Sequence, residues 1–159
     1  MEVVAQSSVY ELERGKPTPD KLHAFIQQQL LFLIKLYYRE TFDVLPELNI
    51  IFDGEKSIPD LAIYKKNTLD FTKNETNVSK IPVGTIEILS GQQPLSELTS
   101  KLQRYIKAGV QSYWLVVPEL QSIYVFHNAS ESKIYGKKDH LKDEVLKIEL
   151  DLQEVFEGM

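Results

Sequence analysis

Two acidic residues and a lysine are the side chains of this sequence whose placement could support chemistry. Asp60 opens the apolar stretch "DLAIYK", although aspartate is disfavoured in strands and rarely buried without a partner. Glu87 interrupts a second apolar stretch, and Lys101 lies in a later segment of helical periodicity. Paired carboxylates bind hard divalent cations, and a nearby amine can orient water or stabilise charge on phosphate. If these three side chains meet, phosphodiester hydrolysis is the chemistry that they suit.

Each of these residues also has an ordinary structural interpretation. Asp60 could be a turn residue that happens to precede a strand. Glu87 could face water from an edge strand, and Lys101 could form a surface ion pair with Glu97, four residues earlier on the same helix. Spacing along the chain therefore indicates an acidic site without establishing one.

Two segments have the apolar periodicity of helices that are buried on one side. The first covers residues 19–39, with Thr18 as the expected N-cap and Pro19 at the first helical position. The second covers residues 94–108 and is expected to end at Gly109. The second helix lies between two apolar segments, so we expect it to connect parallel neighbouring strands.

Most of the remaining sequence has the character of strands. Pro46 indicates a bulge or an edge position, residues 66–79 are polar and predict a loop, and residues 112–118 are apolar throughout, as in a central strand. The class is therefore α/β, with a mixed central β-sheet flanked by helices. The expected strands are 9–15, 42–54, 60–65, 83–90, 112–118, 121–127, 133–137 and 145–150, the last two at edges, followed by a short helix capped by Asp151.

Composition places the chain among ordinary globular proteins. Its 159 residues, 43% of them hydrophobic, fit a single domain spanning residues 1–159. Cysteine is absent, which excludes thiolate metal sites and suits a reducing cytoplasm, and no apolar run is long enough to span a bilayer. The net charge of −5 argues against a protein that coats nucleic acid, but a nuclease site that gathers carboxylates around a metal remains compatible with it.

Two stretches carry a more specific signal, "PDLAIY" and "VGTIEILSGQQPLSELTSKLQRYIKAGVQSYWLVVPELQSIYVF". Their combination resembles the Uma-type putative restriction endonucleases, a bacterial family within the PD-(D/E)XK nuclease superfamily. The matching residues are Pro59, Asp60, Pro82, Glu87, Ile88, Leu89, Ser90, Glu97, Lys101, Tyr105, Ala108, Gly109, Val110, Tyr113, Trp114 and Pro118, with His23 and Glu47 also fitting the layout of the family.

The resemblance implies a restriction-endonuclease-like fold with a catalytic Asp–Glu–Lys set. Asp60 and Glu87 would be the metal-binding carboxylates, with Mg²⁺ or Mn²⁺ as cofactor. The lysine of the superfamily usually lies two residues after the glutamate, where this chain has Leu89. In this family the lysine has moved to the following helix, so the role passes to Lys101.

Three further residues enter as accessories of that site. The resemblance implies that Glu47 or Glu11 adds another carboxylate, while Tyr105 either braces the lysine or belongs to the core. Family members often carry S-P-S-T after the glutamate strand, where this chain has "SGQQ", and an acidic residue at the position of Val117. Both departures lie outside the Asp–Glu–Lys set and concern the loops around it.

The expected function is a metal-dependent endonuclease that hydrolyses phosphodiester bonds, of DNA rather than RNA, and that acts as a homodimer without a membrane partner. The alternative is a catalytically inactive nuclease-fold protein with a binding or regulatory role. The acidic net charge and the lack of an obvious lysine- and arginine-rich patch favour the alternative. A small-molecule hydrolase ranks last because the sequence offers no nucleophile–histidine arrangement.

Overall fold

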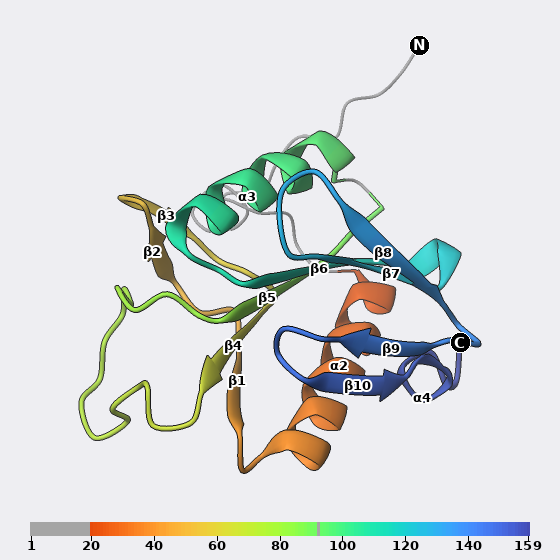
Figure 1. Ribbon diagram of the computed structural model, residues 1–159, viewed down its shortest axis with the longest axis horizontal. Coiled ribbons are helices and arrows are strands. Elements are labelled where there is room, and N and C mark those ends of the chain that lie inside the picture. Colours follow the sequence, from red (N-terminus) through yellow and green to blue (C-terminus); the bar gives the residue numbers. More distant parts are fainter. Residues whose placement is uncertain (1–19, 92) are drawn as a thin grey trace.

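In the computed structural model, which describes residues 20–91 and 93–159, a six-stranded sheet forms the centre of the molecule (Figure 1). Neighbouring strands run antiparallel, except for the parallel pair in the middle. In spatial order the strands are β1 (Phe42–Pro46), β4 (Leu61–Lys65), β5 (Gly84–Ile88), β6 (Ser112–Val117), β7 (Ser122–Phe126) and β8 (Ser132–Gly136).

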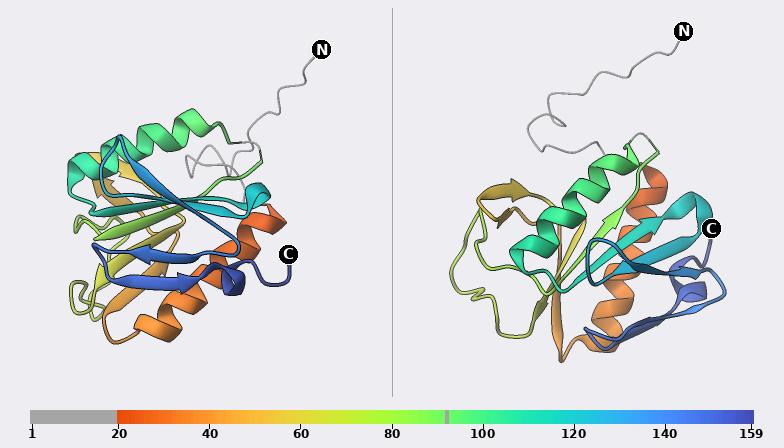
Figure 2. Two further views of the ribbon diagram at one scale, coloured as in Figure 1. Left: turned by 45° about the vertical axis from the view of Figure 1, so that its right-hand side comes forward. Right: turned by 45° about the horizontal axis from the view of Figure 1, so that its top comes forward.

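The parallel strands β5 and β6 are joined by helix α3 (Leu95–Ala108), as the sequence predicted. Helix α2 (Lys21–Tyr38) lies on the opposite face of the sheet, so the sheet is the middle layer of three (Figure 2). Side chains alternate between these faces along each strand. On β6, for example, Trp114 and Val116 pack in the cluster with α2, whereas Tyr113 and Leu115 pack in the cluster with α3.

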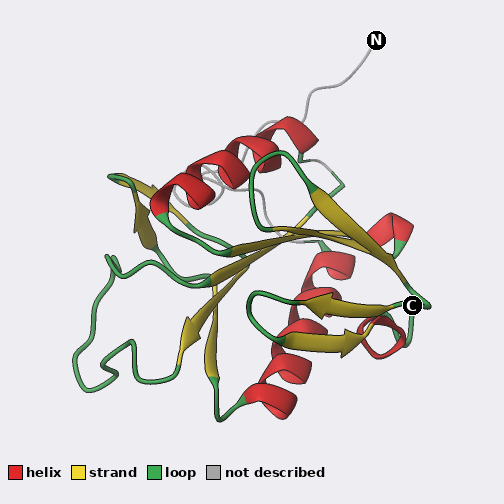
Figure 3. Ribbon diagram, viewed as in Figure 1, coloured by secondary structure: helices red, strands yellow, loops and turns green. Residues whose placement is uncertain are grey.

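Two small hairpins complete the layers on either side of the sheet (Figure 3). Strands β2 (Ile50–Phe52) and β3 (Glu55–Ser57) pair with each other, and Phe52 stacks on Tyr105 of α3 with ring centroids 4.0 Å apart. Strands β9 (His140–Asp143) and β10 (Ile148–Asp151) form a second pair. Together with the short helix α4 (Leu152–Val155), this second hairpin extends the apolar cluster around α2.

The ends of the helices agree in part with the sequence-based predictions. Gly109 ends α3 in the left-handed conformation, with φ = 112°, and Asp151 caps α4 by accepting a hydrogen bond from the Gln153 amide at 2.9 Å. The prediction for the start of α2 was wrong, because Asp20 rather than Thr18 is its N-cap. The Asp20 carboxylate accepts a hydrogen bond from the amide of His23 at 2.8 Å.

Several strand predictions require correction. The expected strand over 42–54 is split into β1 and β2, because Glu47 adopts a left-handed backbone conformation, with φ = 55°. Pro46 does lie on an edge strand, where its missing amide hydrogen costs no ladder bond. The strand expected over 145–150 pairs with β9 outside the central sheet. The strand expected over 9–15 lies outside the described residues.

Strand β3, the 3-10 helix η1 (Pro118–Leu120) and strand β9 were not anticipated from the sequence. Among the residues that the structure describes, no helix combines the length and hydrophobicity needed to cross a membrane.

A buried aspartate ties the β9–β10 hairpin to the sheet. Asp143 is 1% exposed, and its carboxylate accepts hydrogen bonds from the indole nitrogen of Trp114 at 2.8 Å and from the amides of Val145 and Leu146 at 3.0 Å. The Nε2 atom of His127 lies 3.0 Å from the same carboxylate. These contacts satisfy a buried charge that would otherwise be costly, and they fix Trp114 in the core.

We therefore expect Asp143→Ala to lower the free energy of unfolding by about 2–4 kcal/mol, since it leaves several buried donors without an acceptor. Urea-induced unfolding followed by tryptophan fluorescence measures the change. The neighbouring Glu144, whose side chain is 75% exposed, offers a matched control, and Glu144→Ala should change stability by less than about 0.5 kcal/mol. Equal losses in the two variants would contradict a structural role for the Asp143 carboxylate.

Candidate active site

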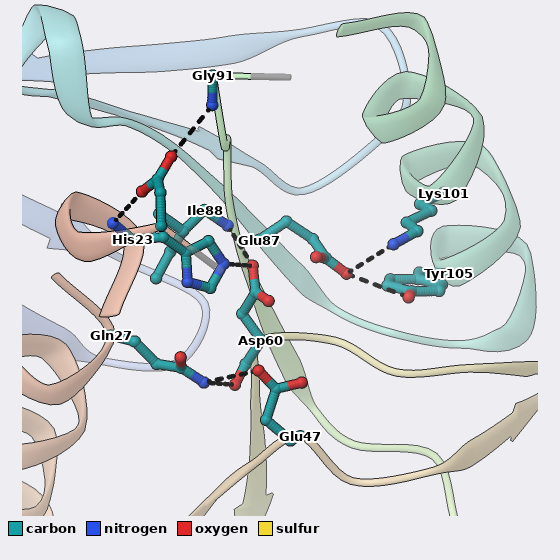
Figure 4. A network of polar contacts seen from close by, with 10 residues as sticks. His23, Gln27, Glu47, Asp60, Glu87, Ile88, Gly91, Lys101 and Tyr105 are labelled. Atoms are coloured by element: carbon teal, nitrogen blue, oxygen red, sulfur yellow. Dashed lines mark hydrogen bonds and ion pairs between the residues drawn. The ribbon is translucent and has the colours of Figure 1, made fainter. Parts of the chain in front are cut away.

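Asp60 and Glu87 lie beside each other where β4 begins and β5 ends. In the antiparallel pairing of these strands Leu61 faces Ile86, so one further step along the same register brings Asp60 opposite Glu87. Both acids are 1% exposed. The Oδ2 atom of Asp60 accepts a hydrogen bond from the amide of Ile88 at 2.7 Å, which joins the acid to the backbone of β5 (Figure 4).

The local sequence explains why Glu87 points toward α3. Ile86 and Ile88 on either side of it pack into the apolar cluster with α2, so the alternation of a strand turns Glu87 to the other face. Strand β5 is interior to the sheet, and the interpretation of Glu87 as a water-facing edge residue is therefore wrong. Asp60 does stand in the bend before a strand, but its carboxylate is buried rather than solvated.

Helix α3 brings two polar side chains, one turn apart, to Glu87. The Lys101 ammonium lies 4.0 Å from Glu87 Oε1, and the Tyr105 hydroxyl donates a hydrogen bond to the same oxygen at 3.2 Å (Figure 4). Lys101 is only 7% exposed, so its interpretation as a surface residue paired with Glu97 is wrong. At 4.0 Å the amine is near Glu87 but beyond hydrogen-bond distance.

Tyr105 belongs both to the core and to the site. It is fully buried, and its hydroxyl oxygen lies 2.6 Å from Ser57 Oγ. Because the tyrosine proton is directed to Glu87, the serine hydroxyl is the donor in that second contact. Burial raises the pKa of Tyr105 well above its usual value, and the charge of Glu87 raises it further. Tyr105 is therefore a neutral hydrogen-bond donor to Glu87 over the whole physiological pH range.

Helix α2 contributes two contacts to Asp60 that the sequence did not predict. The Nε2 atom of His23 lies 3.0 Å from Asp60 Oδ2, and the side-chain amide of Gln27 donates a hydrogen bond to the backbone carbonyl of Asp60 at 2.8 Å. His23 had entered only through the layout of the family, without a role. The spacing of His23 and Gln27, four residues apart on one helix, is the signal that could have linked them.

The two accessory carboxylates have different outcomes. Glu47 lies next to Asp60: its amide donates to the Asp60 carbonyl at 3.3 Å, and its Oε1 accepts from Gln27 at 3.4 Å. Glu11 lies outside the described residues. Glu47 therefore contacts the backbone of Asp60, and its role as a further metal-binding carboxylate stays a prediction.

The donor set fits a small, hard divalent cation. Buried carboxylates are costly when they are charged, and a cation bound by both acids would offset that cost. Within residues 20–91 and 93–159, no group of three or more histidine, aspartate or glutamate side chains is arranged to hold a metal ion. The protein would thus supply mainly the oxygens of Asp60 and Glu87. This suits Mg²⁺, which commonly keeps several waters and binds through one or two carboxylates and substrate phosphate.

The mixed central sheet with a helix on each face is a restriction-endonuclease-like fold, as the sequence led us to expect. The model of the Uma2 family, described as "Putative restriction endonuclease", matches residues 9–157, and the chain belongs to this family. Membership makes nucleic-acid cleavage the class of function to consider.

One solved structure is similar over most of its length. It is a protein of Anabaena variabilis ATCC 29413, described as a putative nuclease belonging to DUF820, with a TM-score of 0.76 and 21% sequence identity. The similarity covers 88% of this chain and 83% of the other, and at this identity it shows a shared fold. A comparison with curated proteins found no match.

The buried hydroxyl of Tyr105 predicts a pH effect on stability. Because the pKa of Tyr105 is raised in the folded state, unfolding releases its proton above about pH 10, where an exposed tyrosine ionises. Its contribution to stability is complete below that pH and is lost as the pH rises toward the folded-state pKa. Urea unfolding at several alkaline pH values should therefore show a smaller decline for Tyr105→Phe than for the unmodified protein. Parallel declines would contradict the buried, neutral state.

Proposed function

We propose that this protein is a metal-dependent endonuclease that uses Asp60, Glu87 and Lys101 to hydrolyse phosphodiester bonds. The observation that carries the proposal is the convergence of these three residues, 27 and 14 positions apart along the chain, in one buried region. Structural ion pairs can also bury acids. Such pairs do not require two acids at adjacent positions of paired strands with a lysine from a helix beside them.

Each residue has a distinct task in this proposal. Asp60 and Glu87 bind Mg²⁺ or Mn²⁺ through carboxylate oxygens. The bound cation would polarise the phosphate and lower the pKa of a water. Lys101, shielded from bulk solvent near Glu87, orients the attacking water and balances negative charge on the phosphate. Tyr105 holds Glu87 by a hydrogen bond, and therefore acts as a positioning residue.

DNA is the substrate we propose, in preference to RNA, with the protein acting as a homodimer. Simultaneous cleavage of both strands of a duplex uses two sites, and a two-fold dimer presents two sites symmetrically. The acidic chain must attract its polyanionic substrate locally, so metal binding would supply positive charge at the site. The second candidate, a binding protein that has lost catalysis, is favoured by the net charge of −5.

The first test is cleavage of plasmid DNA and of labelled DNA and RNA oligonucleotides with Mn²⁺, Mg²⁺ or EDTA. We expect metal-dependent cleavage that falls at least about 100-fold in Glu87→Gln, because a carboxylate that organises charge in the transition state is lost. Glu144→Gln, which removes an exposed carboxylate, should leave the rate unchanged. No metal-dependent cleavage above the Glu87→Gln background on any substrate would reject the enzyme and favour the binding protein.

A second pair of variants tests the lysine separately. Lys101 and Lys107 both lie on α3, but the Lys107 side chain is 78% exposed and paired with Asp53. Lys101→Met should reduce the cleavage rate about 100-fold or more while leaving Mn²⁺ binding largely intact, since the amine acts on the reacting groups rather than on the metal. Lys107→Met should cleave normally. Equal rates for the two variants would remove Lys101 from the catalytic set.

A further inference from the structure

We propose that His23 and Gln27 form a two-point clamp from α2 that presets the Asp60 carboxylate for metal binding. This inference deepens the proposed function and rests on it. The clamp joins the N-terminal part of α2 to the acid at the start of β4, and its two residues act as positioning residues that need not contact metal or substrate (Figure 4).

The first point of the clamp is the side chain of Asp60. Its Oδ2 atom receives the amide of Ile88 at 2.7 Å and lies 3.0 Å from Nε2 of His23. These two partners come from different layers of the fold, the sheet and α2. A carboxylate oxygen held in this way cannot exchange places with its twin by rotation without breaking both contacts. The plane of the carboxylate is thereby fixed before any cation arrives.

The second point is the backbone of Asp60. Its carbonyl oxygen receives the side-chain amide of Gln27 at 2.8 Å and the main-chain amide of Glu47 at 3.3 Å. Glu47 makes this contact with a positive φ of 55°, a conformation that non-glycine residues rarely adopt. Asp60 lies in a bend at the start of β4, and these two contacts hold its carbonyl and so help to define the direction in which its side chain leaves the backbone.

Burial of His23 has a free-energy cost, which packing in the core does not explain. His23 is 3% exposed, and within the described residues its Nδ1 atom is buried without a hydrogen-bond partner. An apolar residue at this position of α2 would avoid the unsatisfied nitrogen. The position instead holds a side chain whose other nitrogen reaches Asp60. Together with Gln27, one helical turn later, it directs two donors from one face of α2 to a single residue.

The test compares Mn²⁺ affinity, measured by isothermal titration calorimetry, with thermal unfolding of the metal-free protein. Partners that orient metal ligands typically contribute about 10- to 100-fold in affinity, so His23→Asn and Gln27→Ala should each weaken Mn²⁺ binding by about that factor. His23→Gln, whose amide nitrogen can take the place of Nε2, should stay closer to the unmodified protein than His23→Asn.

Gln29 supplies the matched control for Gln27. It lies on the same helix and likewise donates to backbone carbonyls, those of Glu154 at 3.1 Å and Val155 at 3.5 Å, but it does not touch Asp60. Gln29→Ala should lower thermal stability to a similar extent as Gln27→Ala while leaving Mn²⁺ affinity within about threefold. This pair keeps the test decisive even if substitutions of the fully packed His23 fail to fold.

The outcomes separate the clamp from the proposed function. If the unmodified protein binds Mn²⁺ and the Gln27→Ala and His23→Asn variants bind it equally well, the clamp is overturned and the metal site stands. Equal weakening by Gln27→Ala and Gln29→Ala also overturns the clamp, because the effect would then be general destabilisation. If the unmodified protein fails to bind Mn²⁺ at millimolar concentration, the proposed function falls and the clamp falls with it.

Discussion

Two buried acidic residues at adjacent positions of paired strands, Asp60 and Glu87, are the constraint around which this structure is arranged. Like charges out of water destabilise a fold unless hydrogen-bond donors or cations offset them. Every layer of the protein contributes such an offset. The sheet provides the Ile88 amide, α2 provides His23, and α3 provides Tyr105 and Lys101.

The layered architecture explains how a short chain achieves this convergence. Asp60 and Glu87 are adjacent only because β4 pairs with β5, and α3 returns across the face toward which Glu87 points because β5 and β6 are parallel. Helix α2 covers the other face, yet its first turns reach the end of the sheet and meet Asp60 there. The site therefore depends on tertiary packing, because the groups that contact these two acids come from different layers of the fold.

The residues of the candidate site that could be selected from the sequence are those whose types disagree with the local structure around them. An aspartate before a strand and a glutamate inside one are visible because they contradict strand preferences, and the helix that carries Lys101 follows from apolar periodicity. The roles of His23 and Gln27 could not be predicted, because an ordinary amphipathic helix tolerates both residues. Their contacts with Asp60 form only when α2 packs against the start of β4.

The same limits of local sequence patterns explain the errors in the predicted helix and strand positions. Asp20 and Thr18 are both common N-cap residue types, and Pro19 favoured Thr18 in the sequence because proline is common at the first helical position. The segment 145–150 has the pattern of a strand, but the pattern does not specify that β9, rather than the central sheet, is its partner. Glu47 divides the predicted strand 42–54 by adopting a backbone conformation that its residue type disfavours.

The most direct test of this account is anomalous diffraction from crystals of the protein soaked in Mn²⁺. The account predicts an anomalous peak bonded to carboxylate oxygens of both Asp60 and Glu87 at about 2.0–2.3 Å, the range for oxygen ligands of small divalent cations. A fully soaked crystal with no peak between the two acids, or with a peak bound to only one of them, would contradict it.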